Sequence, residues 1–147
     1  MRRATQTAII GFADAISAGV PVLAQELCHE IAGKHTCDLR LSKQKLAVEF
    51  PAVNYGEVLD EEDPYWGDGL TRESQEAVSQ RGSNFVRWLL ERPETKVVVA
   101  THSNWLASLF NAVLEIHEQA SDQAEVGCDL TAWFDTGEMR TVLLAPL

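Results

Sequence analysis

The chain has 147 residues, enough for one compact domain with its own hydrophobic core. A net charge of −10, from 22 acidic and 12 basic residues, excludes an overall basic surface for nucleic acid or for an anionic membrane. No apolar run reaches the length of a bilayer span, and the three cysteines lack the spacing of a disulfide framework. We therefore expect a cytoplasmic protein with reduced thiols.

The N-terminal part of the chain predicts mostly helix. Apolar residues lie near one stripe over residues 4–18, and Gly19 can end this helix. The short apolar stretch 21–23 predicts a brief strand. Residues 25–31 predict one or two turns of helix that end at Gly33.

The middle of the chain combines helices with one long loop. Residues 39–48 alternate basic and apolar side chains and are expected to be helical. Residues 52–71 contain an acidic run and several helix breakers, which predicts an irregular loop. The clearest helix of the chain is expected after Thr71 or Ser74 and runs to Arg92.

A strand, a polar turn and a helix are predicted over residues 96–116. The run 97–100 is short, apolar and β-branched, which is typical of a strand buried on both faces of a parallel sheet. The polar turn 101–104 contains His102. The apolar residues that follow it recur at helical spacing. Ligands of open α/β sheets bind at this edge, and the amides of a helix N-terminus attract anions. His102 is therefore a candidate binding residue, with capping or packing as its structural alternative.

The C-terminal part predicts a hairpin. Two strands, 130–135 and 139–144, are expected around the turn signal Asp135-Thr136-Gly137-Glu138. The alternation of helices and strands predicts an α/β fold in a single domain that covers residues 1–147.

Other residues have suitable chemistry for such a site. The guanidinium of Arg3 can bind a phosphate in a bidentate manner, and a carboxyl group at Glu26 or Glu30 can serve as a general acid. A different interpretation is a zinc site, because Cys28, His29, His35 and Cys37 are all zinc-competent residue types. Their spacing lacks the paired cysteine knuckle that structural zinc sites favour.

Several motifs together resemble the histidine phosphatase superfamily, the phosphoglycerate-mutase-like fold. Arg3-Ala4-Thr5-Gln6-Thr7-Ala8 resembles its R-A-x-x-T-A helix start, and the strand ending in Thr101-His102-Ser103 resembles its second signature. Similarity to one branch of small members extends through Leu27–Gly33, Cys37-Asp38-x-Arg40, Asp63-x-x-Trp66, Arg72-Glu73-Ser74 and Arg81 with Phe85-x-x-Trp88-Leu89.

The resemblance implies a three-layer α/β sandwich with a mostly parallel central sheet. It also implies a reaction in which a histidine of an R-H-G motif attacks the phosphoryl group of a small phosphorylated substrate, without cofactor or metal. Arg3, His102 and Ser103 would hold the phosphoryl group, and Glu30, with Glu26 in reserve, would protonate the leaving oxygen. We favour a phosphatase over a mutase, because the small members are the more similar.

One element of the family pattern is absent from these 147 residues. No histidine lies in an R-H-G motif, so the resemblance places the nucleophile and the first, central strand upstream of Met1. We therefore expect this polypeptide to be inactive by itself and marginally stable. The alternative is a non-catalytic phosphate-binding or interaction module that keeps the fold.

Overall fold

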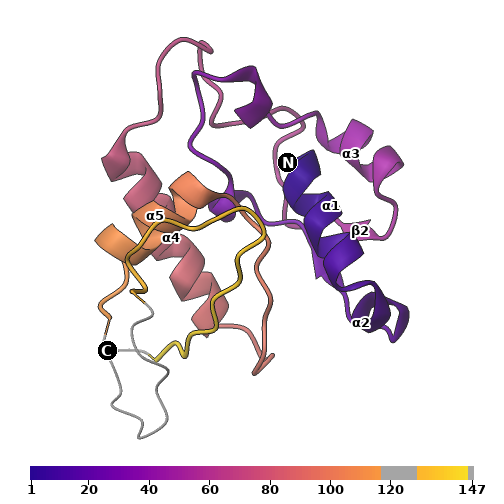
Figure 1. Ribbon diagram of the computed structural model, residues 1–147. Helices are drawn as coiled ribbons and strands as arrows, with labels where there is room; N and C mark the ends of the chain where they lie inside the picture. Colours follow the sequence, from indigo (N-terminus) through magenta and orange to yellow (C-terminus); the bar gives the residue numbers. More distant parts are fainter. Residues whose placement is uncertain (117–128, 146–147) are drawn as a thin grey trace, which may run out of the picture.

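The computed structural model describes residues 1–116 and 129–145 (Figure 1). Its helices are α1 (Arg2–Gly11), α2 (Ala13–Ser17), α3 (Lys43–Glu49), α4 (Gln75–Leu90) and α5 (Ser103–Ala112), with short 3₁₀ turns η1 (Glu26–Cys28) and η2 (Thr36–Asp38). Strands β1 (Val22–Leu23) and β2 (Val53–Asn54) pair in parallel, with Val22 opposite Val53. Within the described ranges, no helix is long and apolar enough to cross a membrane.

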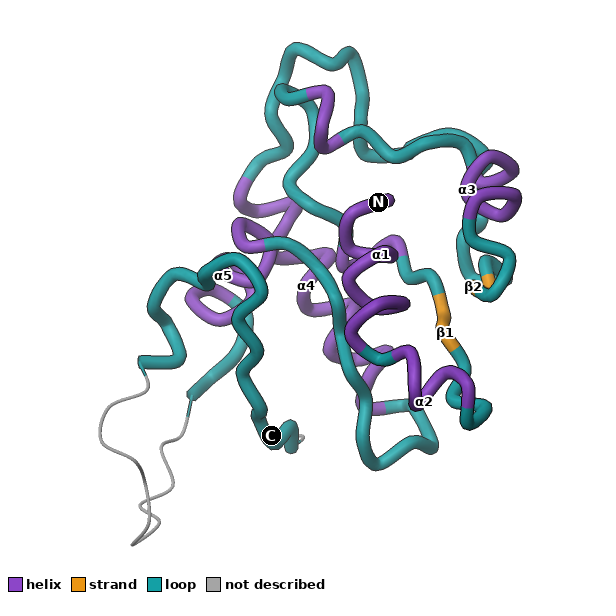
Figure 2. The backbone as a smooth tube through the Cα atoms, turned by 45° about the vertical axis from the view of Figure 1, so that its right-hand side comes forward, coloured by secondary structure: helices purple, strands orange, loops and turns teal. Residues whose placement is uncertain are grey.

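The predicted helix over residues 4–18 forms as two helices. The backbone at Phe12 leaves the helical region, with φ of −123° and ψ of 28°, so α1 ends before it and α2 begins after it. None of the residues of α1 is fully buried. The helix therefore lies at the surface, with its first turn available to a site (Figures 1 and 2).

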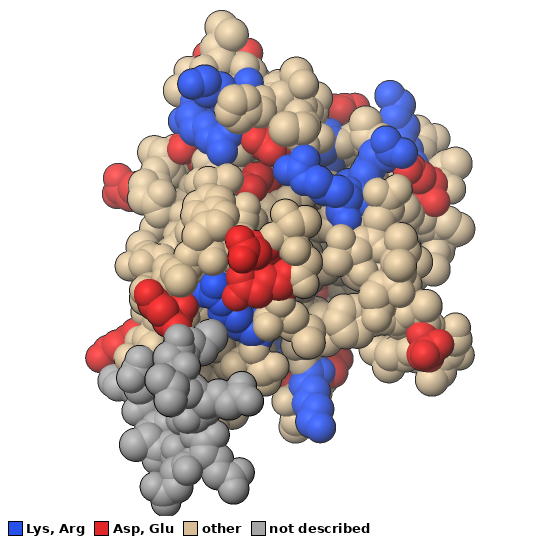
Figure 3. Space-filling view, in the orientation of Figure 1, with Lys and Arg blue, Asp and Glu red and all other residues tan. Residues whose placement is uncertain are grey.

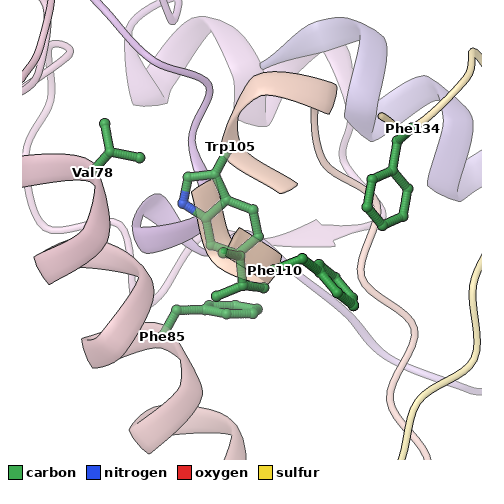
Figure 4. Close-up of a cluster of buried hydrophobic side chains, with 6 residues drawn as sticks. Val78, Phe85, Trp105, Phe110 and Phe134 are labelled. Atoms are coloured by element: carbon green, nitrogen blue, oxygen red, sulfur yellow. The ribbon is translucent and has the colours of Figure 1, made fainter. Parts of the chain in front are cut away.

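The main hydrophobic core lies between α4 and α5. Ser74 caps α4, since its hydroxyl accepts a hydrogen bond from the Ala77 amide at 3.2 Å. Phe85 of α4 meets Trp105 of α5 edge to face, with ring centroids 5.1 Å apart (Figure 4). The buried members of this core are Val78, Phe85, Trp105, Leu109, Phe110 and Phe134. This packing fixes the N-terminal end of α5 relative to α4.

A second cluster packs α3 against the small sheet. Its buried members are Leu46, Phe50, Val53, Tyr55 and Val58. Ser42 caps α3 by accepting from the Lys45 amide. Figure 2 shows α3 and β2 on the opposite side of α1 from α5. The fold is thus α/β, with helices packed beside a short parallel sheet.

The prediction of a strand at residues 97–100 is wrong. This segment runs as a loop, and Val97, Val98 and Val99 are 46%, 59% and 37% exposed. A strand requires hydrogen bonds to a neighbouring strand, and the described residues supply none there. Instead, residues 97–100 and β1 both line a cavity of about 310 Å³ beside the apolar face of α1.

The predicted hairpin strands 130–135 and 139–144 also do not form. The turn between them exists, because the Glu138 amide donates to the Asp135 carbonyl at 3.1 Å and Gly137 has a φ of +77°. The Arg140 guanidinium donates to the carbonyls of residues 130, 132 and 133, each at 2.9 Å. A side chain therefore satisfies carbonyls that a ladder would use.

Candidate functional site

His102 lies at the junction between the 97–100 segment and α5. It is the residue before the first turn of α5, and its extended backbone (φ −130°, ψ 151°) lets the helix begin at Ser103. Its side chain does not cap the helix and is almost fully buried. The ring lines the 310 Å³ cavity, so the structural alternative of a capping histidine is not supported.

Arg3 comes from the first turn of α1 and reaches the His102 ring. Its Nε donates to Nδ1 of His102 at 3.3 Å, although the two residues are 99 positions apart. Because Nδ1 accepts this hydrogen bond, the ring proton lies on Nε2. Burial, and then the positive charge of Arg3, lower the pKa of His102 to about 3. At neutral pH the ring is therefore an uncharged donor at Nε2.

The other nitrogens of Arg3 are held by the η2 turn. Nη1 donates to the Cys37 carbonyl at 2.9 Å, and Nη2 donates to Asp38 Oδ1 at 3.1 Å. The Asp38 carboxylate is buried, whereas the Arg3 side chain is 49% exposed. The Arg3 guanidinium is thus oriented by the buried Asp38 carboxylate and by the exposed Cys37 carbonyl, while part of it faces solvent. Asp38 was missed as a site residue by sequence reasoning, although it lies in the Cys37-Asp38-x-Arg40 motif.

Glu30 is bound to the N-terminal turn of α5. Oε1 accepts from the amides of Ile31 at 2.9 Å and Trp105 at 3.0 Å, and Oε2 accepts from Asn104 Nδ2 at 3.4 Å. The buried carboxylate thus places a negative charge at the helix N-terminus, where it is stabilising. Glu30 therefore lies beside His102 and Ser103, and its role as general acid stays a prediction.

Glu26, the alternative acid, lies in an ion pair with Arg40. Arg40 Nε is 2.7 Å from Oε1, and its Nη2 donates to Oε2 at 3.2 Å. Burial raises the pKa of Glu26, and the positive charge of Arg40 opposes that change. A raised pKa suits a general acid, but both oxygens of Glu26 are occupied by the guanidinium.

His29 is a buried structural residue. Its Nδ1 lies 2.7 Å from the Glu30 carbonyl, and its Nε2 lies 3.1 Å from Asp63 Oδ2. Burial acts to raise the pKa of Asp63, but His29 and the amides of Arg40 and Tyr65 outweigh it and lower that pKa to about 2. Both ring nitrogens of His29 therefore face acceptors, and neither offers a free lone pair.

The zinc interpretation is not supported. No three potential ligands among the described histidines, cysteines and carboxylates come together in a geometry for a metal ion. Burial raises the pKa of the Cys28 thiol to about 11. Cys37 is exposed and lies beside Asp38.

The low pKa of His102 predicts a specific pH dependence of stability. An unfolded histidine has a pKa of about 6.5, so between pH 6.5 and 3 the unfolded chain binds a proton that the folded chain does not. The stabilising effect of neutral His102 is complete above pH 6.5 and is lost as the pH falls. We expect His102→Gln to flatten the pH dependence of the unfolding free energy by up to about 1.4 kcal/mol per pH unit between pH 6 and 4.

Urea unfolding of the wild type and His102→Gln at pH 7, 6, 5 and 4 measures this difference. The comparison removes the contributions of other titrating groups, because both proteins carry them. Parallel pH profiles for the two proteins would contradict the assignment of a buried neutral imidazole.

Comparison with known proteins defines the class to which this chain belongs. The chain belongs to the histidine phosphatase superfamily (branch 1), whose family model matches residues 1–138. This confirms the resemblance and the α/β fold class inferred from the motifs.

The relatives are longer proteins of Arabidopsis thaliana. The chain is 32% identical to phosphoglycerate mutase-like protein 1 over 124 residues. This aligned region covers 84% of the chain and 42% of the relative. It is 36% identical over 92 residues to a phosphoglycerate mutase-like protein, covering 63% of the chain and 34% of the relative. The chain thus spans less than half the length of these relatives. No solved structure matches it.

Proposed function

We propose that the chain carries the phosphate-holding part of a histidine phosphatase site and serves the hydrolysis of a small phosphomonoester. The observation that carries this proposal is the 3.3 Å contact between Arg3 Nε and His102 Nδ1. It brings together the residues of the two family motifs, which lie 99 positions apart. Phosphoryl transfer depends on positioned cations and hydrogen-bond donors more than on elaborate covalent machinery.

The donors at this place suit a phosphoryl group. Arg3 is a permanent cation whose side chain is half-exposed, and neutral His102 keeps a proton on Nε2. Ser103 begins α5 beside them and adds a hydroxyl and the positive end of the helix dipole. Most of the basic side chains on the face shown in Figure 3 lie in its upper half, around the N-terminal end of α1. On a chain of net charge −10, the half-exposed guanidinium of Arg3 beside these donors favours an anionic ligand.

The proposed reaction proceeds through a phosphohistidine. A histidine nitrogen attacks phosphorus, the bond to the leaving oxygen breaks, and Glu30, which must be protonated at the start of this step, gives that oxygen its proton. Water then attacks the phosphohistidine, its proton passes to the Glu30 carboxylate, the P–N bond breaks, and phosphate is released. Oε2 of Glu30 accepts only the 3.4 Å bond from Asn104 among the described residues, whereas Glu26 is held by Arg40 through both oxygens. We therefore retain Glu30 as the proposed acid and Glu26 as the reserve.

The nucleophile of this reaction is not identified within the 147 residues. None of the four histidines lies in an R-H-G motif, and both nitrogens of His29 face acceptors. We propose that the attacking histidine is supplied from outside this sequence. The second candidate function is a non-catalytic phosphate-binding module. It is favoured by the observation that both ring nitrogens of His29 face acceptors, so that His29 has no nitrogen available for attack.

Turnover of p-nitrophenyl phosphate by the purified chain tests this assignment. We expect no turnover above the buffer rate for the wild type or for His102→Ala. Turnover by the wild type that is lost in His102→Ala would show that the described residues contain a nucleophile, and it would contradict this part of the proposal.

A further inference from the structure

The buried carboxylate of Asp38 holds two arginines at once. Oδ1 accepts from Arg3 Nη2 and Oδ2 accepts from Arg72 Nη1, both at 3.1 Å. The two oxygens of one carboxylate therefore hold both guanidiniums, and one of them, that of Arg3, also contacts the His102 ring. The Arg72 side chain is 31% exposed, and Asp38 is its only hydrogen-bond partner among the described residues.

The backbone around Arg72 is held closely against the segment that carries Glu30. The Glu73 amide donates to the Ala32 carbonyl at 3.0 Å. Gly33 has a φ of +105°, and a Cβ at that position would lie 1.9 Å from the Thr71 carbonyl oxygen. Only glycine permits this approach. Arg72 is thus delivered to Asp38 by a fixed backbone rather than by a chance surface contact.

The group formed by Arg3, Arg72 and Asp38 has one more positive charge than negative charge. Two guanidiniums share one carboxylate, and His102 adds no charge because its ring is neutral. Each guanidinium has five N–H donors, and Asp38 uses one on each arginine. Arg72 therefore retains donors for an anion at the place where Arg3 faces solvent.

We propose that Arg72 is a second phosphate-binding arginine of this site and that Asp38 is the residue that positions both arginines. The inference rests on the proposed function, because it assigns a further ligand to the same phosphoryl group. It adds a residue that directly follows the 52–71 loop and lies outside the Arg3–Ala8 and Thr101–Ser103 motifs.

Titration of the isotope-labelled wild-type chain with inorganic phosphate tests this role through the arginine Nε–Hε resonances. We expect the signals of Arg3 and Arg72 to shift along one saturation curve and the signal of Arg87 to stay unchanged. Arg87 is the matched control, because it is exposed on α4 and contacts Asn84. This measurement uses the wild-type chain alone, so it does not depend on whether a substituted protein folds.

Affinity measurements complete the test. Arg72→Gln is expected to weaken phosphate binding about tenfold, as for loss of a charged hydrogen bond. Arg72→Lys is expected to lie between it and the wild type, and Arg87→Gln is expected to leave the affinity unchanged. A shift of Arg3 without Arg72, or an unchanged affinity in a folded Arg72→Gln, overturns this inference and leaves the proposed function standing. No shift of either arginine contradicts the proposed function itself.

Discussion

Glu73→Ala is expected to lower the free energy of unfolding by about 3–5 kcal/mol, which removes much of the stability of a domain of this size. Glu73 accepts from Arg81 Nε at 2.8 Å and from Nη2 at 2.7 Å, and both side chains are at least nine-tenths buried. Arg81 also donates to the Leu27 and His29 carbonyls. Removing the carboxylate leaves a buried cation without its charge partner, and urea unfolding measures the cost.

A surface pair provides the matched control for this prediction. Glu94 forms a bidentate pair with Arg92, but it is exposed to solvent. Glu94→Ala should therefore leave the stability nearly unchanged. The double replacement Arg81→Met with Glu73→Leu should recover part of the loss, because no buried charge remains. Equal destabilisation by Glu73→Ala and Glu94→Ala would contradict the structural role of the Arg81 pair.

The purified chain is expected to melt at low temperature and over a broad range. The cavity beside α1 has a volume of about 310 Å³ and is lined largely by apolar side chains. Because this apolar pocket is open to solvent, its lining residues do not contribute the free energy that a packed core would gain from burying them. The exposed valines 97–99 add apolar surface without a partner.

Scanning calorimetry and binding of a hydrophobic dye measure this prediction. We expect a weak, broad transition and dye binding at room temperature. A single cooperative transition above about 65 °C, without dye binding, would contradict it.

The helices around the site were largely predictable from local pattern. Thr71 and Ser74 were the two candidate caps of the helix that became α4, and Ser74 is the one that caps it. The helical spacing of apolar residues from Trp105 onward located α5. These features depend on residues close in sequence. The strand at 97–100 was wrong because an apolar run indicates burial, whereas a strand also needs a hydrogen-bonded neighbour. No local signal reports whether that neighbour is present.

The site was predictable only in part. The family motifs indicated Arg3 and His102, and their contact needed the folded chain, since α1 and α5 are far apart in sequence. The anchoring of Glu30 to the Trp105 amide depends on a tertiary contact that leaves no periodic pattern. Asp38 and Arg72 lie outside regular helices and strands, where position is set by contacts such as the approach of Gly33 to Thr71.

Calorimetric titration with inorganic phosphate at pH 7 tests the central claim, that Arg3 and His102 hold a phosphoryl group. The wild type should bind phosphate, and Arg3→Gln and His102→Ala should each weaken binding about tenfold or more. Arg2→Gln is the matched control, because Arg2 is the adjacent arginine and pairs with Glu49 away from His102. Binding that is weakened only in the Arg3 and His102 variants supports the account; equal affinity in all four proteins, or no binding by the wild type, contradicts it.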